Sequence, residues 1–247
     1  MSARALVNEF AKMRHLHVVF VAGVLLAVVL GIGLYAGVMN PDFDRTTGTS
    51  WTLLLMGLGS GVMISPLLLA VLASRLVDAE HQDGGWLMST TSGVTAGELC
   101  RAKLVALGCL VTGSVVLASA LFAGVGLLVG IDASLPAARW LGLTVCLLVV
   151  NLAVLALHVV LAARVENQIV GMGVGLLGTV LALFGSAVPT WIAHLTPWGY
   201  YALSSAAGYV DGELTGYSPS YLSVTGLGLV VAVLFVLFTR SFDRQEA

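Results

Sequence analysis

The sequence predicts an all-α membrane protein with six transmembrane helices in a single domain over residues 1–247. Apolar residues make up 58% of the chain and charged residues 10%, whereas a soluble domain has about 45–50% and about 25%. Six apolar runs are each long enough to cross a hydrocarbon core about 30 Å thick as a helix. This composition excludes an ordinary water-soluble enzyme, and a net charge of −2 offers no footprint for nucleic acid.

The predicted transmembrane helices cover residues 18–39, 53–73, 104–130, 140–163, 169–188 and 221–238. None of the segments between them is long enough to form a separate globular domain. If the N-terminus is cytoplasmic, nine of the 11 lysines and arginines lie on the cytoplasmic side, and only Arg45 and Arg139 lie outside. Because cytoplasmic loops are enriched in basic residues, both termini are expected to be cytoplasmic.

Two features bear on how these helices pack. Ser65 and Pro66 interrupt the second run, and a proline there leaves a backbone carbonyl without its partner, so a kink facing protein is expected. Glycines spaced four residues apart allow close contact between helices. Such pairs are Gly33 with Gly37, Gly57 with Gly61, Gly126 with Gly130, and Gly171 with Gly175.

The three cysteines are expected to be reduced core residues, so neither a disulfide framework nor a metal site is predicted.

Residues 1–17 precede the first apolar run and have the pattern of an amphipathic helix. Leu6, Phe10, Met13 and His17 recur at helical spacing, while polar residues occupy the rest of the helical wheel. This pattern predicts a helix lying on the inner membrane surface. The alternative is a basic flank that only sets the orientation of the first helix.

The cytoplasmic segment 74–103, between the second and third helices, combines acidic residues, two glycines and an aromatic residue. Its distinctive stretch contains Asp78, Glu80, His81, Gln82, Asp83, Gly84, Gly85 and Trp86. Aromatic side chains anchor interfaces well, so this stretch is a candidate docking site for a partner protein. The alternative is a solvated loop with Trp86 among the lipid headgroups. Thr95 and Glu98 form a capping-box pattern that predicts a helix start.

The segment 189–220, between the fifth and sixth helices, is too rich in aromatic residues for a flexible loop. Its candidate residues are Trp191, His194, Pro197, Trp198, Tyr200 and Tyr201. Re-entrant extracellular helices are predicted here, because irregular backbone at membrane depth must be buried in protein or face water. The alternative is an aromatic belt that only anchors the sixth helix.

Motifs for chemistry are missing from this chain. Its two lysines, Lys12 and Lys103, do not follow a glycine-rich phosphate-binding turn, so ATP hydrolysis of the P-loop kind is excluded. No catalytic residue or metal ligand is predicted. Asn151 and His158 share one face of the fourth helix and form a candidate intramembrane polar site. The alternative, which we favour, is an interhelical hydrogen bond, or a histidine near enough to the cytoplasmic end of its helix to meet water.

These pieces together resemble the membrane subunit of an ABC transporter of the ABC-2 type, also called type V. The resemblance lies in NEFAKMR near the N-terminus, in the E-H-x-x-G-x-W stretch at 80–86, and in LTPWGYY at 195–201. Six spans and cytoplasmic termini agree with it. In its size and in having no fused ATPase, the chain resembles the bacterial permeases of bacitracin and lantibiotic immunity.

The resemblance implies an exporter subunit of the bacterial cell membrane, driven by a separate ATPase subunit and paired with a second permease, identical or different. ATP and Mg²⁺ would belong to the ATPase, and this chain would hold no cofactor. The 78–86 stretch would be the coupling helix that contacts the ATPase, and the 189–220 segment would be an extracellular gate. An interface helix would form a second contact through Glu9, Phe10, Lys12 and Arg14. The cargo would be amphiphilic or peptide-like, as antibiotics are. An alternative function is a membrane scaffold or sensor that only holds a partner.

Overall fold

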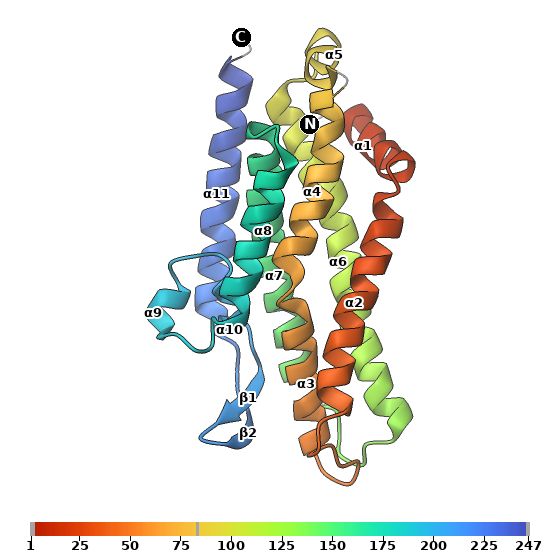
Figure 1. The fold of residues 1–247 in the computed structure, drawn as a ribbon, viewed down its shortest axis with the longest axis vertical. Coiled ribbons are helices and arrows are strands. Elements are labelled where there is room, and N and C mark those ends of the chain that lie inside the picture. The colour runs from red at the N-terminus through yellow and green to blue at the C-terminus, as the bar shows by residue number, and fades with distance from the viewer. Residues whose placement is uncertain (1–2, 83, 246–247) are drawn as a thin grey trace.

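The structure is a computed structural model that describes residues 3–82 and 84–245. Long helices aligned along one axis dominate it (Figure 1). The helices are α1 (Ala3–His15), α2 (Val18–Val38), α3 (Thr49–Val62), α4 (Ser65–Gln82), α5 (Gly85–Thr91), α6 (Ala96–Val129), α7 (Ala137–Arg164), α8 (Gln168–Leu183), α9 (Thr190–Ala193), α10 (Tyr200–Leu203) and α11 (Tyr221–Gln245). One antiparallel hairpin, β1 (Ala207–Val210) and β2 (Glu213–Gly216), is the sheet within these residues. The predicted helical class is confirmed, but the hairpin was not predicted.

Four of the described helices, α2, α6, α7 and α11, are long and apolar enough to cross a membrane, and the bent pair α3 and α4 counts as a fifth if its two helices form one span. Helix α8 occupies the position of the predicted fifth span but has 16 residues. A sixth span and the orientation of the chain therefore stay predictions. Figure 1 places α1, α5 and the end of α11 at the same end of the bundle, which is called the α5 end below.

The second predicted span is broken where the sequence placed a kink. Helix α3 ends at Val62, α4 begins at Ser65, and the two helices are bent by 41°. Pro66 lies in the first turn of α4, where the missing N–H would have had no helical partner in any case. The boundaries differ from the prediction of 53–73, because α4 continues past the apolar run to Gln82. Helix α6, which corresponds to the third predicted span, likewise begins at Ala96 instead of residue 104. The Thr95 hydroxyl caps α6 by accepting a hydrogen bond from the Glu98 N–H at 3.2 Å.

Glycine contacts hold two helix pairs together, as the spacing predicted. A Cβ added to Gly33 in α2 would lie 2.4 Å from the carbonyl oxygen of Gly57 in α3, and one on Gly61 would lie 2.6 Å from the carbonyl oxygen of Val29. Helix α8 meets α4 in the same way, with Gly175 against Ala70. The fourth pair is different. Gly126 lies under Trp51, but Gly130 ends α6 at a positive φ of 75° and makes no such contact.

The aromatic segment (residues 189–220) contains two single-turn helices, α9 and α10, and the hairpin. Figure 1 shows α9 and α10 beside the half of the bundle that is distant from α5. Of the three cysteines, Cys100 and Cys146 are buried and Cys109 is exposed. The expectation that Cys109 belongs to the core was therefore wrong, because its face of α6 points away from the other helices.

Candidate functional site: the α5 end of the bundle

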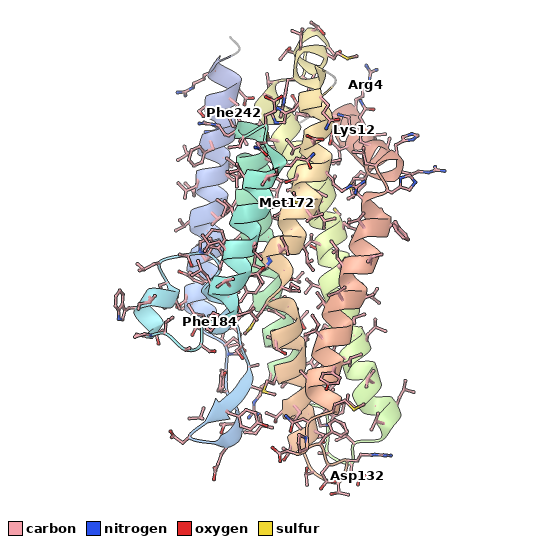
Figure 2. All side chains as sticks on the ribbon, in the orientation of Figure 1. Arg4, Lys12, Asp132, Met172, Phe184 and Phe242 are labelled. Carbon is pink, nitrogen blue, oxygen red and sulfur yellow. The ribbon has the colours of Figure 1, made fainter. Side chains whose placement is uncertain are left out.

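Four charged side chains from three helices meet near the α5 end and form what we call the four-charge cluster. Its members are Glu9 and Lys12 of α1, Glu80 of α4 and Lys103 of α6. The Lys103 Nζ donates hydrogen bonds to Glu9 Oε2 and Glu80 Oε1, both at 2.8 Å, and to the Leu76 carbonyl at 2.9 Å. Lys12 bridges the same two carboxylates, at 3.0 Å from Glu9 Oε1 and by a short contact with Glu80 Oε1. Lys12 is labelled in Figure 2.

The cluster is electrically balanced and almost fully enclosed. Glu9 and Lys103 are 0% exposed and Glu80 is 2% exposed, whereas the Lys12 side chain is 35% exposed. Two carboxylates face two ammonium groups, which are the only lysines of the chain. Because a buried charge without partners is costly, the three enclosed members, Glu9, Glu80 and Lys103, have to be in place together. The cluster therefore fixes α1, α4 and α6 relative to one another.

Lys12 gives this cluster a signature in its dependence on pH. Burial by itself lowers the pKa of Lys12, but the hydrogen bond to Glu80 and the neighbouring Glu9 carboxylate outweigh burial and raise the pKa above its usual value of 10.5. A raised pKa means that the ammonium form stabilises the fold, fully below pH 10.5 and less as the pH rises through the folded-state pKa. The difference in melting temperature between the wild type and Lys12→Met is expected to shrink above pH 10.5. A difference that stays constant from pH 7 to pH 11 would contradict this assignment.

The two glycines after α4 turn the chain back over Glu80. Gly84 has a φ of +64°, a left-handed conformation that glycine adopts without strain. A Cβ on Gly85 would lie 2.3 Å from Glu80 Oε2 and 2.9 Å from the Glu80 Cα. Both glycines are therefore needed for α5 to begin directly above the four-charge cluster.

His81 and Trp86 join α5 to the end of α7. The Trp86 indole N–H donates to His81 Nδ1 at 3.3 Å, and His81 Nε2 lies 2.9 Å from the Ala162 carbonyl oxygen. Since an indole nitrogen can only donate, Nδ1 must accept, which leaves the proton on Nε2 to bind Ala162. The two rings also make an edge contact, with centroids 5.6 Å apart.

The end of α11 is attached to the same assembly. Asp243 accepts hydrogen bonds from the Thr95 hydroxyl and from two nitrogens of Arg101, both at 3.1 Å, at the start of α6. Gly97 allows this approach, because a Cβ there would lie 2.1 Å from the Thr239 carbonyl oxygen. The base of α5 is thus connected to α1, α4, α6, α7 and α11.

The exposed apolar residues of α5, Leu87 and Met88, follow directly after the predicted coupling stretch, which ends at Trp86. Leu87 and Met88 of α5 are 70% and 66% exposed. Between α5 and α1 lies a cavity of about 190 Å³, lined by Asn8, Lys12, Met88 and Ser92 among others. An exposed apolar tip beside a cavity lined by both polar and apolar side chains is a surface that can bind another protein.

The predicted coupling residues take different positions. Gln82 and Gly84 are exposed, Asp78 is half-buried and bound by Gln82, and Asp83 lies outside the described residues. Glu80, which was predicted to contact a partner, is instead buried in the four-charge cluster, while Trp86 is half-buried against His81.

The face of helix α1 that packs against the protein includes Glu9, which the prediction placed among the polar residues of the helical wheel. Ala5, Glu9 and Met13 are its buried residues, while Phe10 is 43% exposed and Arg14 is exposed. The prediction placed Glu9 on the polar face because it treated the helix alone. Lys103 neutralises Glu9 inside the protein, so the carboxylate turns inward. Residues 1–2 of the predicted helix lie outside the described part of the chain.

The aromatic segment has both exposed and buried members. Trp191 is 67% exposed, His194 binds the Thr190 carbonyl and the Ser223 hydroxyl, and Tyr200 makes an edge contact with His194. Trp198 lies half-buried against Gly178 of α8. Pro197, also half-buried, lines a cavity of about 420 Å³ between this segment, α7 and α11.

Asn151 and His158, the predicted intramembrane polar pair, differ in their hydrogen bonds. Asn151 binds Tyr201 and the Leu147 carbonyl, while the buried Nε2 of His158 has no hydrogen-bond partner among the described residues. Lys103 was counted among the cytoplasmic basic residues and excluded as a phosphate ligand, and its role in the cluster was not predicted. Its position at the start of an apolar run was the available signal, since a charge there needs a partner.

Fold and site together define a helical membrane protein with several candidate spans and a tightly connected end that carries an exposed apolar tip. A family model described as "ABC-2 family transporter protein" matches residues 5–182, which include all four members of the charge cluster. The chain therefore belongs to the ABC-2 family and is a membrane permease component of an ABC transporter. Comparison with the curated proteins found no match. The family assignment describes a transport component that is not catalytic by itself.

Proposed function

We propose that this chain is the permease subunit of an ATP-driven bacterial exporter and that a separate ATPase subunit docks on α5. The α5 end would then face the cytoplasm, and ATP and Mg²⁺ would be held by the ATPase. The observation that carries the proposal is the exposed apolar tip, Leu87 and Met88, mounted on a base that five helices share.

The four-charge cluster supports this function mechanically. Glu80 lies directly below the Gly84 and Gly85 turn, and Lys103 ties Glu80 to α1 and α6. A force applied to α5 therefore acts on α4, α1 and α6 together instead of bending one loop. In this mechanism, closure of the ATPase displaces the connected helices, and their glycine-lined contacts repack to alternate access.

The remaining parts of the proposal follow from this mechanism. A second permease subunit, identical or different, would complete the membrane unit within the bilayer, with α1 as a second ATPase contact. The cargo would be amphiphilic or peptide-like, since the 420 Å³ cavity beside the aromatic segment is lined mainly by apolar side chains with His194, Thr196 and Tyr200 at one end. Resistance to an antibiotic peptide in the host cell is the corresponding biological role.

A double substitution in α5 tests the docking surface. Leu87→Ala with Met88→Ala is expected to weaken ATPase binding at least tenfold and to remove the ATPase stimulation measured in nanodiscs, because truncating apolar anchors costs about 1–2 kcal/mol each. Both side chains are exposed, so the melting temperature of the permease should not change.

Leu222→Ala is the matched control, because Leu222 is 89% exposed at the start of α11, far from α5. The ATPase for this test is identified by co-purification with the chain from its native membrane. Unchanged binding and turnover in the α5 double variant would refute docking at the tip. Binding without any cargo-linked turnover in the wild type would instead favour a scaffold or sensor.

A further inference from the structure

A group of polar side chains surrounds the break between α3 and α4. The Tyr201 hydroxyl of α10 donates to Asn151 Oδ1 of α7 at 3.0 Å, and the Ser65 hydroxyl of α4 lies beside the same Tyr201 oxygen. Tyr201 is 2% exposed and Asn151 is 1% exposed. Three segments far apart in sequence thus meet at the point where the bent span changes direction.

The backbone at the break is also held from outside its own helix. The first N–H groups of a helix have no partner within it. In α4 the Leu67 N–H donates to the Thr179 hydroxyl of α8 at 3.2 Å. The bend therefore depends on side chains of α7, α8 and α10, because α3 and α4 do not satisfy it alone.

There is free space beside the bend. A cavity of about 60 Å³ is lined by Val62 and Ser65 on the two sides of the break, by Val29 of α2, by Val111 and Val115 of α6, and by Asn151. Protein interiors are packed closely, so a helix can change its angle only where a gap permits movement. This gap adjoins the residues that hold the bend.

We propose that residues 62–65 form a hinge in the second span and that the Tyr201 hydroxyl is the latch that sets its angle. Beyond the hinge, α4 continues without interruption to Glu80, where it joins the four-charge cluster. On the other side, Tyr201 belongs to the aromatic segment. The latch therefore links the angle of α4 at the α5 end to the position of the aromatic segment, and Tyr201 is a positioning residue for that coupling.

Distances between spin labels at Thr49 and Gln82, measured by double electron–electron resonance, test the latch. Both side chains are exposed, and they lie at the start of α3 and the end of α4. The labels are attached in nanodiscs to a variant with Cys100, Cys109 and Cys146 replaced by alanine. Straightening the 41° bend between helices of 14 and 18 residues lengthens this distance. At 1.5 Å of rise per residue the increase is about 3 Å.

With Tyr201→Phe, a second population at the longer distance is expected, whereas the parent variant should show one distance. Tyr200→Phe is the matched control, since it removes a hydroxyl that makes no hydrogen bond among the described residues, one position away. A single, unshifted distance in Tyr201→Phe would overturn the proposal. If that variant does not enter nanodiscs, Asn151→Leu removes the same bond from the α7 side and decides the question by the same distances. No ATPase is present, so the outcome does not depend on docking at α5.

Discussion

Replacing Lys103 with methionine is expected to destabilise the protein by about 3–5 kcal/mol, the usual effect of removing one partner from a buried ion pair. Lys103 is the only member of the four-charge cluster that contacts both carboxylates from a fully enclosed position. Without it, Glu9 and Glu80 would share the single, partly exposed ammonium of Lys12. One buried carboxylate would then lack a counter-charge, and α1 would separate from α4 and α6.

Thermal unfolding in detergent of a Cys109→Ala background, followed by the reactivity of the buried Cys100 and Cys146 with a thiol dye, measures this effect. Lys12→Met should destabilise less, because Lys12 is 35% exposed. Adding Glu80→Gln to Lys103→Met restores charge balance and should recover part of the lost stability. If Lys103→Met melts at the wild-type temperature, the cluster does not hold the α5 end together.

Gly33→Ala is expected to have the second largest effect, a destabilisation of about 1–3 kcal/mol or more, as is usual for overpacking. The added Cβ would lie 2.4 Å from the backbone oxygen of Gly57 and 2.6 Å from the Phe122 ring. A side chain could rotate away, but a backbone oxygen cannot, so α2 and α3 would have to separate. Loss of their contact would also expose the α3 backbone at membrane depth.

Gly31→Ala on the same helix is the matched control, because nothing lies within 4 Å of a Cβ at that position. It should be neutral or slightly stabilising, since alanine favours the helix over glycine. Melting temperatures of the two variants in the same detergent make the comparison. Equal temperatures would contradict the close contact between α2 and α3.

The helical architecture could be predicted because its causes are local or periodic. Apolar runs identified the long helices, Pro66 located the break, and the capping pattern at Thr95 located the start of α6. Glycine spacing also indicated that α2, α3 and α8 can make close contacts, but it did not predict which helix each one meets. Each of these signals depends on residues close together in the sequence.

The site could be predicted only in part, because its bonds join distant residues. Lys103 lies 94 positions from Glu9 and 23 from Glu80, and no periodicity relates them. Glu9 was therefore assigned to the polar face of its helix and Glu80 to a docking surface, although both are buried. The acidic and glycine-rich turn was correctly singled out, but it supports the exposed tip of α5 and does not itself form that tip.

Site-specific crosslinking at Leu87 tests the central claim most directly. A benzoylphenylalanine at this position is illuminated in the native membrane, and the captured protein is identified by mass spectrometry. The same residue at Leu222 is the control. We expect Leu87 to capture a polypeptide that contains a P-loop ATPase motif and Leu222 to capture none. Capture of such an ATPase at Leu222, or its absence at Leu87, would contradict the claim that the α5 end receives the driving force.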